Sequence, residues 1–450
     1  MKYSILTRSY DLRWVYPTEI NEWLYEAYWY GFVRYTESQT IALGYDARLS
    51  SPTLKEAIIR WANNAGAKVV DIWLCSSDML SFSTCFYDDI DAGIMITASH
   101  NPKDQNGIKS MRHNGFPINL KNEWNDILVY MDEYDTMNHA SQRNVEVRDV
   151  KNDWTDRILS FSETKNFSSL KIVVDGGNWA AGSYIEAIAE KAWFQMIPLF
   201  IEPDGNFPNH HPNPMLPENR EAARKKIIET GADIGLLFDG DADRVVVLDN
   251  RWNLVVSWVL CAVIAAALLE KSWGKSIGGN AVISHTLEDI VTELWGQYKR
   301  MRVDSVAIKT EMLKNPDIIF AWEHSTHYFF WSNWCTDSGI IASFVFLDIF
   351  LRSGLTLEAL IAKYQRYITL EEENFIVADR NMAINTLRSI YSWENYDDFD
   401  GLTVRYDDKS WWNVRPASND PVIRLNMEAV SRDRFNALYK EVTKHLKQFK

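Results

Sequence analysis

Glycine is scarce in this chain, with 20 glycines among 450 residues, whereas globular proteins usually contain about 7%. Cysteine is scarcer still. The four cysteines lack the spacing of metal ligands, so the sequence predicts buried free thiols at Cys75, Cys85, Cys261 and Cys335. The longest apolar run, residues 259–269, is too short to span a bilayer and predicts a buried helix.

Basic residues are also in deficit, with 47 lysines and arginines against 61 aspartates and glutamates and a net charge of −14. This balance argues against nucleic acid or an anionic membrane as a partner. A small anionic substrate stays open, because local arginines and a metal ion can set the field of a cleft. The first residues, 1–4, lack the basic and apolar segments of a signal peptide. We therefore expect a soluble cytoplasmic protein, monomeric or weakly oligomeric, that acts on small molecules.

Apolar runs alternate with helical segments along most of the chain, which predicts parallel strands joined by crossover helices. The runs expected to form these strands are residues 41–44, 68–72, 93–97, 170–175, 233–238, 280–284 and 318–320. Near the C-terminus the pattern changes: residues 401–406 and 421–425 suggest antiparallel strands, and residues 433–449 form an amphipathic helical pattern.

The expected architecture is therefore α/β, with three similar mixed α/β domains followed by a smaller α+β domain. A polar stretch at residues 138–153 marks the first boundary. The predicted domains are 1–150, 151–255, 256–370 and 371–450.

Two short motifs carry the chemistry. Residues 97–102 (Thr-Ala-Ser-His-Asn-Pro) offer the hydroxyl of Ser99 at the end of an apolar run, and residues 239–244 (Asp-Gly-Asp-Ala-Asp-Arg) offer three carboxylates at alternate positions. The acidic motif follows a predicted strand, where open α/β sheets place their ligands. A hydroxyl that can carry a phosphoryl group and a carboxylate cage for Mg²⁺, a hard ion that prefers oxygen, are the equipment for phosphoryl transfer.

Each motif alone has a plainer interpretation. The acidic motif is similar to part of a calcium loop, or to an acidic turn that caps a helix, and a serine beside a histidine commonly makes only local hydrogen bonds. Together, and in this order, the motifs resemble the α-D-phosphohexomutase family of phosphomannomutases, phosphoglucomutases and phosphoglucosamine mutases. The resemblance runs from about Tyr10 to Ala429 and implies four domains around a central cleft.

The resemblance implies a reaction site in which Ser99 is carried as a phosphoserine that donates its phosphoryl group and takes back another. The residues with implied catalytic roles are Ser99, His100, Lys109 and Arg13. The implied Mg²⁺ ligands are Asp239, Asp241 and Asp243, with a phosphate oxygen on Ser99 completing the shell. Arg244 is expected to contact the substrate or the phosphate, whereas Arg48 is expected to be structural.

Two further loops resemble the parts of the family that hold the substrate. Glu323, Ser325 and His327 match the sugar-reading loop Gly-Glu-x-Ser-Gly-His, whose polar side chains can discriminate sugar isomers. Residues 415–421 match the loop that binds the non-reacting phosphate. There Arg415 can bind phosphate through two hydrogen bonds, and Ser418 and Asn419 are expected to compensate for the hydroxyl lost at Ala417.

The chain departs from the family pattern in two ways. Ser305 stands where the family commonly has a histidine, a candidate proton-transfer group, so the general acid and base stay unassigned. Tryptophan is abundant, with 19 residues, and several tryptophans stand where the family expects glycine. They are Trp14, Trp73, Trp179, Trp193, Trp252, Trp258 and Trp322, with Trp61 and Trp273 as further candidates.

Glycine is used where φ is positive or where backbones approach closely, and tryptophan fits such sites badly. One interpretation is that the gene reads a stop codon as glycine and that tryptophan was written in its place. The other is drift toward a pseudoenzyme. Positive φ at these tryptophans would favour the first interpretation.

The function that the resemblance implies is interconversion of hexose 6-phosphate and hexose 1-phosphate, with mannose and glucose as candidate sugars, through a phosphoserine and a bisphosphate. Two alternatives remain open at this point: a phosphoglucosamine mutase, and a non-catalytic relative that binds sugar phosphates.

Overall fold

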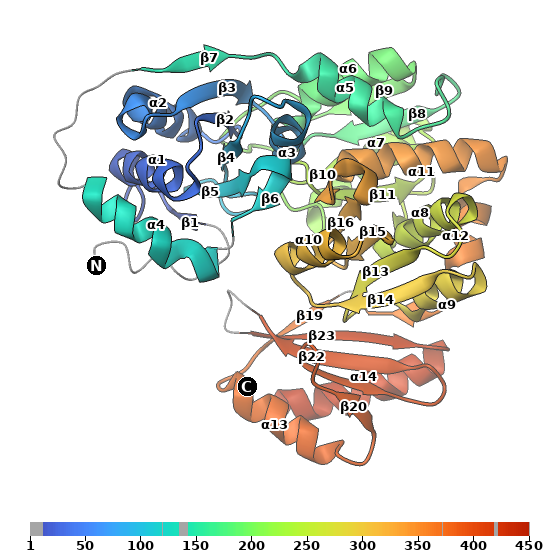
Figure 1. The fold of residues 1–450 in the computed structure, drawn as a ribbon. Coiled ribbons are helices and arrows are strands. Elements are labelled where there is room, and N and C mark those ends of the chain that lie inside the picture. The colour runs from blue at the N-terminus through green and yellow to red at the C-terminus, as the bar shows by residue number, and fades with distance from the viewer. Residues whose placement is uncertain (1–11, 119, 135–142, 371, 418–421, 450) are drawn as a thin grey trace. The chain divides into compact units, whose positions relative to one another are not determined.

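The computed structural model describes residues 12–118, 120–134, 143–370, 372–417 and 422–449. The chain forms two compact units, and Figure 1 labels their helices and strands. The first unit joins Met1–Val255 to Thr326–Leu357, and the second joins Val256–Ser325 to Glu358–Lys450.

The first sheet of the first unit has the strand order β1-β5-β4-β2-β3-β7, with β6 beside β5. Its strands are β1 (Leu12–Val15), β2 (Thr40–Tyr45), β3 (Lys68–Leu74), β4 (Ala92–Ile96), β5 (Gln105–Arg112), β6 (Phe116–Pro117) and β7 (Val145–Val147). The strands from β4 to β7 in this order are parallel, whereas β5 is antiparallel to both β4 and β1. The helices are α1 (Glu22–Thr36), α2 (Ser51–Trp61), α3 (Ser77–Phe86) and α4 (Leu120–Tyr134). One apolar core joins α1, α2 and α4 to β2 and β4.

The second sheet of this unit has the order β12-β11-β10-β8-β9. Its strands are β8 (Lys171–Asp175), β9 (Gln195–Leu199), β10 (Ile234–Phe238), β11 (Val245–Asp249) and β12 (Leu254–Val255). The strands β9, β8 and β10 are parallel, and β11 and β12 continue the sheet antiparallel. The accompanying helices are α5 (Lys151–Ser160), α6 (Ala181–Ala192) and α7 (Glu221–Thr230). A later segment returns to this unit as β16 (His327–Phe330), β17 (Thr336–Asp337) and α11 (Gly339–Ser353).

The second unit contains the parallel strands β14-β13-β15 and a separate antiparallel sheet of order β18-β23-β22-β21-β20, with β19 beside β23. The first strands and their helices are α8 (Ser257–Lys271), β13 (Ser276–Asn280), α9 (His285–Glu293), β14 (Gln297–Met301), α10 (Ser305–Lys314), β15 (Ile318–Glu323) and α12 (Leu357–Tyr364). The C-terminal elements are β18 (Ile368–Thr369), β19 (Glu373–Ile376), α13 (Arg380–Ile390), β20 (Asn395–Asp397), β21 (Leu402–Arg405), β22 (Trp411–Pro416), β23 (Val422–Ala429) and α14 (Arg432–Leu446).

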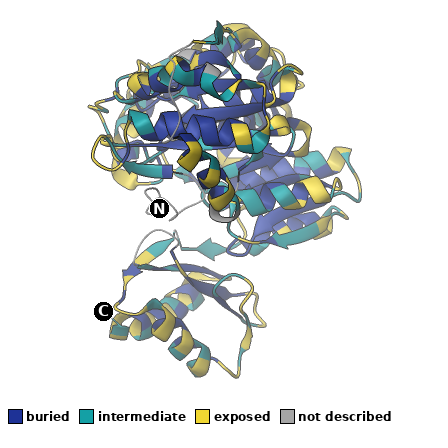
Figure 2. Ribbon diagram, turned by 60° about the vertical axis from the view of Figure 1, so that its left-hand side comes forward, coloured by how far each residue is buried: buried dark blue, intermediate teal, exposed yellow. Residues whose placement is uncertain are grey.

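These elements confirm the predicted fold class, mixed α/β sheets followed by an α+β region. Figure 2 shows the buried residues gathered in the strands, with exposed residues along the outer helix faces. The four cysteines are buried free thiols, as predicted. Among the described residues no single helix is long and apolar enough to cross a membrane.

One predicted strand is wrong. Residues 281–284 form a turn that leads into α9, and the strand β13 ends just before them, at Ser276–Asn280. This strand contains Gly278 and Gly279, and glycine lowers strand propensity, so the sequence pattern conceals it. Both glycines are buried, and a Cβ on Gly278 would lie 2.5 Å from the Met301 side chain. Close packing therefore requires glycine here, and glycine weakens the strand pattern in the sequence.

Several tryptophans have left-handed backbone conformations. The positive-φ tryptophans are Trp73, Trp193, Trp252, Trp295 and Trp334, with φ from 51° to 68°. Three of them are among the glycine positions predicted from the sequence, and the other two were not predicted. The remaining predicted positions, Trp14, Trp61, Trp179, Trp258, Trp273 and Trp322, do not have positive φ.

Candidate active site

The serine loop, residues 97–102, follows β4 and holds Ser99 with φ at +50°. A non-glycine residue persists in this region only when its surroundings hold it there. The amide of Ser99 donates to Thr97 Oγ1 over 2.9 Å, and the Thr97 hydroxyl in turn donates to Asp46 Oδ2 over 2.7 Å. The buried Ser99 side chain is therefore held in one position.

Arg48 also holds the serine loop in place. It is fully buried and pairs with Asp46 (Nε to Oδ2, 3.0 Å). Its NH2 group donates to the carbonyl oxygens of Ser99 and Asn101, at 2.8 Å each, and its NH1 group donates to those of Pro102 and Gln105. One guanidinium thus donates to four backbone carbonyls in the serine loop and at the start of β5. These contacts fit the structural role expected for Arg48.

The aspartate loop, residues 239–244, follows β10 and contacts the serine loop directly. Ser99 Oγ lies 3.4 Å from Asp239 Oδ2. A Cβ on Gly240 would lie 2.5 Å from the carbonyl oxygen of Ser99, so the close approach of the two backbones requires glycine. Asp239, Asp241 and Asp243 are buried, and one carboxylate oxygen of each lies within 4.8 Å of the others. Ser99 and the acidic trio, far apart in the sequence, meet in space.

Two cations compensate the buried carboxylates. Lys109 in β5 reaches Asp241 Oδ2 at 2.5 Å and Asp243 Oδ2 at 2.8 Å. Arg244 pairs with Asp239, and its NH2 group also donates to Ser99 Oγ over 3.1 Å. Each of the three aspartates thus has a positive group beside it, which lowers the cost of burying so much negative charge.

The protonation states follow from burial and from these neighbours. Burial raises the pKa of Asp239 to about 8, and the nearby charges of Asp243 and Asp241 act in the same direction. Burial also acts to raise the pKa of Asp241, but the net shift is downward because Lys109 and Ser77 stabilise its carboxylate. Burial acts to lower the pKa of Lys109, yet its two aspartates raise the pKa well above the ordinary value. Lys109 is therefore a fixed positive charge.

His100 is held in its neutral form. Burial, reinforced by the charge of Arg244, lowers the pKa of His100 well below its ordinary value. Its Nδ1 lies 3.3 Å from Ser99 Oγ and 2.5 Å from Arg244 NH2. Arg13 in β1 contacts the serine loop, donating to the carbonyl oxygen of Ala98 over 3.3 Å and to Asn101 Oδ1 over 3.2 Å. The four residues with implied catalytic roles thus belong to one neighbourhood.

The donor set of the aspartate loop fits a divalent cation. Within the described part of the chain, Asp241 Oδ1 is buried and has no hydrogen-bond partner. An unsatisfied buried carboxylate oxygen is costly, and a bound cation would satisfy it. Three convergent carboxylates suit a hard ion that prefers oxygen.

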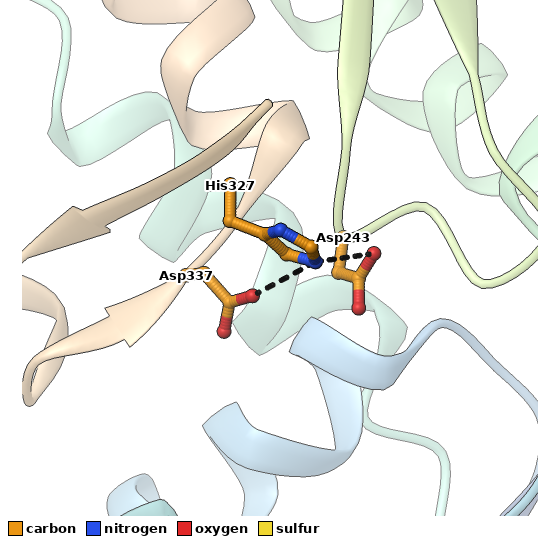
Figure 3. A group of neighbouring side chains, drawn as sticks. All are labelled: Asp243, His327 and Asp337. Atoms are coloured by element: carbon orange, nitrogen blue, oxygen red, sulfur yellow. Dashed lines mark ion pairs between the residues drawn. The ribbon is translucent and has the colours of Figure 1, made fainter. Parts of the chain in front are cut away.

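His327 joins this site from the returning segment, as Figure 3 shows. Its Nε2 lies 3.6 Å from Asp243 Oδ1 and 3.9 Å from Asp337 Oδ2. A backbone bridge between Arg244 and His327 brings the segment there, and a Cβ on Gly339 would lie 2.5 Å from the Arg244 carbonyl carbon. Asp243, His327 and Asp337 can also hold a metal by geometry, but they share Asp243 with the acidic trio.

The other predicted substrate residues lie in the second unit. Ser325 Oγ donates to Glu323 Oε2 over 2.8 Å, which brings two of the predicted sugar-binding groups together. Arg415 is buried in β22. Its predicted companions Ser418 and Asn419 lie outside the described residues.

Sequence reasoning missed several residues at these sites. Ser77 donates its hydroxyl to Asp241 Oδ2 over 2.6 Å, and its amide donates to the Asp241 carbonyl oxygen over 3.0 Å. Asp337 and Glu372 were also missed. Nothing in their local sequence marks these residues, because only the tertiary fold brings them to the site.

A serine hydroxyl thus lies against a buried acidic cluster at the strand ends of mixed α/β sheets, an arrangement typical of phosphoryl-transfer enzymes of α/β architecture.

Comparison with known proteins gives the family. Models described as phosphoglucomutase/phosphomannomutase alpha/beta/alpha domains I, II and III match residues 4–136, 152–252 and 259–367. The chain is 31% identical to the phosphomannomutase of Escherichia coli K12, over 95% of this chain and 96% of that protein. It is 33% identical to the phosphomannomutase of Salmonella montevideo, over 94% of each.

A solved structure of a phosphoglucomutase/phosphomannomutase family protein from Burkholderia thailandensis superposes with a TM-score of 0.87 at 26% identity, covering 98% of this chain and 97% of the other. The chain belongs to the phosphoglucomutase/phosphomannomutase family of α-D-phosphohexomutases, which are isomerases.

Replacing Arg48 tests whether it holds the serine loop. Arg48→Met leaves Asp46 and several loop carbonyls buried without their partner, and we expect it to lower the free energy of unfolding by about 3 kcal/mol. The matched control is Arg143→Met, which removes an exposed pair with Glu56 and should cost less than about 0.5 kcal/mol. Urea unfolding measures both. Equal effects of the two substitutions would contradict the role given to Arg48.

Proposed function

We propose that this protein interconverts hexose 6-phosphate and hexose 1-phosphate through a phosphorylated Ser99 and a bisphosphate intermediate. The observation that carries the proposal is the contact of Ser99 Oγ with Asp239 at 3.4 Å, beside the other two aspartates and Arg244. A serine in a structural loop would have no need of so many buried charges. Phosphoryl transfer needs them, because it depends on positioning and on charge stabilisation.

In the proposed reaction the phosphoryl group passes from Ser99 Oγ to a sugar hydroxyl, and the other phosphate of the bisphosphate later passes back to Ser99 Oγ. Arg244 NH2, 3.1 Å from Ser99 Oγ, is placed to donate to the phosphoryl oxygens as charge spreads over them. Lys109 stays protonated and balances the aspartates. Neutral His100, with Nδ1 3.3 Å from Ser99 Oγ, and Asp239, with Oδ2 3.4 Å from it, are both placed to accept a proton.

Asp239, Asp241 and Asp243, with a phosphate oxygen on Ser99, would hold Mg²⁺. When bound, the ion would neutralise charge on the transferring phosphoryl group. The unsatisfied Asp241 Oδ1 supports this assignment.

Glu323, Ser325 and His327 would bind the sugar hydroxyls, and Arg415, with Ser418 and Asn419, the phosphate that is not reacting. We propose mannose as the first sugar, since the two relatives compared above are phosphomannomutases, with glucose next. N-acetylphosphoglucosamine mutase of Aspergillus fumigatus, solved with GlcNAc-6P and magnesium, has a TM-score of 0.56 at 13% identity. This likeness concerns the fold alone, so the glucosamine alternative is less supported.

The second candidate function is sugar-phosphate binding without turnover. Ser305 favours it, because this serine begins α10 where the family commonly has a histidine. Turnover assays on mannose 1-phosphate, glucose 1-phosphate and glucosamine 1-phosphate separate the three candidates. Binding without conversion of any of them would establish the non-catalytic function.

Replacing Ser99 tests the phosphoryl acceptor. Ser99→Ala removes the oxygen that would carry the group, and we expect mutase turnover to fall by at least about 10³-fold, with loss of covalent phosphate by mass spectrometry. The control is Ser160→Ala, a serine at the end of α5 whose hydroxyl donates to the Arg157 carbonyl oxygen. Turnover that survives in Ser99→Ala would refute the proposed mechanism.

Replacing Asp241 tests the ion site. In Asp241→Asn we expect the Mg²⁺ dissociation constant, measured by titration calorimetry, to rise at least about 100-fold, with a parallel loss of turnover that excess Mg²⁺ only partly restores. Asp156→Asn, which removes an exposed carboxylate paired with Lys191, is the control. Unchanged Mg²⁺ binding in Asp241→Asn would exclude this loop as the ion site.

A further inference from the structure

Glu372, immediately before β19, is the centre of a cluster of hydrogen-bond donors in the second unit. His324 Nε2 lies 3.0 Å, Arg415 NH2 3.1 Å and Asn426 Nδ2 3.4 Å from its Oε2. Arg424 NH1 lies 3.1 Å from its Oε1. Two guanidinium groups, an imidazole and an amide, all distant from Glu372 in sequence, thus converge on one carboxylate.

This donor set suits a phosphate better than a carboxylate. The NH2 group of Arg415 donates to Glu372, whereas the Nε of Arg415 is buried and has no hydrogen-bond partner within the described ranges. A phosphate has three terminal oxygens and can accept from Nε and NH2 together, which is the strong bidentate arrangement. Burial acts against ionisation of Glu372, but His324, Arg415 and Arg424 together hold the pKa of its carboxyl far below the ordinary value. Glu372 is therefore an ionised carboxylate, and the donors around it form a site suited to binding an anion.

We propose that Glu372 is an internal occupant of the site for the non-reacting phosphate and that this phosphate displaces it when substrate binds. The inference rests on the proposed function, which gives Arg415 to that phosphate. Glu372 fills the site in the unliganded enzyme and weakens the hold on hexose phosphates, because each must compete with a carboxylate that is already in place. It thereby sets substrate affinity and eases product release.

The test is the binding of mannose 1-phosphate, measured by titration calorimetry without Mg²⁺ on protein freed of serine phosphate. Glu372→Gln keeps the shape and removes the charge, and we expect its dissociation constant to fall roughly ten-fold. In an Arg415→Met background the same substitution should have little effect, because a double-mutant cycle reports coupling between the two residues. The matched control is Glu373→Gln, which removes a neighbouring carboxylate that accepts from the Tyr439 hydroxyl.

A dissociation constant that is unchanged or higher in Glu372→Gln would overturn the proposal, because Glu372 would then orient Arg415 for the ligand. Absence of any binding in both proteins would overturn the proposal together with the assignment of Arg415. Tighter binding without turnover would support the internal occupant while the proposed reaction fails. The KM in turnover assays should fall in parallel with the dissociation constant.

A second inference stands on the tryptophans, independently of the site. Trp193 ends α6 with φ at 68° and is 69% exposed. The ends of α7 and α11 have the same left-handed cap, and there the residue is glycine, Gly231 and Gly354. An L side chain in this conformation is less favourable than glycine, and an indole exposed to water gains no burial in return.

The same pattern recurs beyond helix ends. Trp73 in β3, Trp252 between β11 and β12, and Trp295 after α9 have φ of 64°, 59° and 60° and are 53%, 40% and 74% exposed. Elsewhere, within the described ranges, the buried indole nitrogens of Trp179 and Trp322 have no hydrogen-bond partner, a cost that a buried tryptophan normally avoids. The left-handed conformation of Trp73, Trp252 and Trp295 fits glycine, whereas the unpaired indole nitrogens of Trp179 and Trp322 are a separate cost at positions without positive φ.

We infer that glycine occupies Trp73, Trp193, Trp252, Trp295 and Trp334 in the protein made by its native host, through a stop codon that the host reads as glycine. Mass spectrometry of the native protein should find glycine in the peptides that span these positions, and the gene should carry UGA there. Tryptophan in the native peptides, or UGG codons, would overturn the inference. In recombinant protein, Trp193→Gly should raise the free energy of unfolding, whereas Trp154→Gly, at a buried position in α5, should lower it.

Discussion

The structure of the first unit depends on the close approach of two backbones at Gly240. Because this residue has no side chain, the aspartate loop lies directly against the carbonyl oxygen of Ser99. The acidic trio is thereby buried, and burial of three carboxylates is tolerable only with Lys109 and Arg244 beside them. The arrangement is charged, enclosed and largely compensated, so a small change in one member changes the charge state of the others.

The support for this arrangement comes from residues that do not take part in the chemistry. Arg48 and Thr97 fix the serine loop, Ser77 fixes Asp241, and Gly339 lets the returning segment reach Arg244. Arg48, Thr97 and Ser77 contribute hydrogen bonds, and Gly339 leaves room for the backbone because it has no side chain. Positioning of this kind accounts for much of what an enzyme does in phosphoryl transfer.

Much of the fold was predictable because the apolar strands are continuous and the motifs follow them directly. Ser99 follows β4 and the aspartates follow β10, so the sequence shows where the reactive groups lie along the sheets. It does not show which loops touch. The contacts of Ser77, Asp337 and Glu372 arise from tertiary packing, and β13 was misplaced because packing against Met301 requires glycine where strand propensity favours larger residues.

Arg415 shows the same limit of prediction from sequence. The sequence marks it as a phosphate ligand through its motif, but gives no sign that a carboxylate 43 residues before it in the chain is its partner. The tryptophans illustrate the converse, since the sequence raised the question of their identity and the backbone conformation decided which positions bear on it.

The restraint of Ser99 has a consequence for how the proposed bisphosphate intermediate would be processed. With its amide tied to Thr97 and its carbonyl to Arg48, the serine has no freedom to travel between two phosphates separated by the width of a sugar ring. In the proposed reaction Ser99 would therefore stay in place, and the bisphosphate would have to turn over within the site.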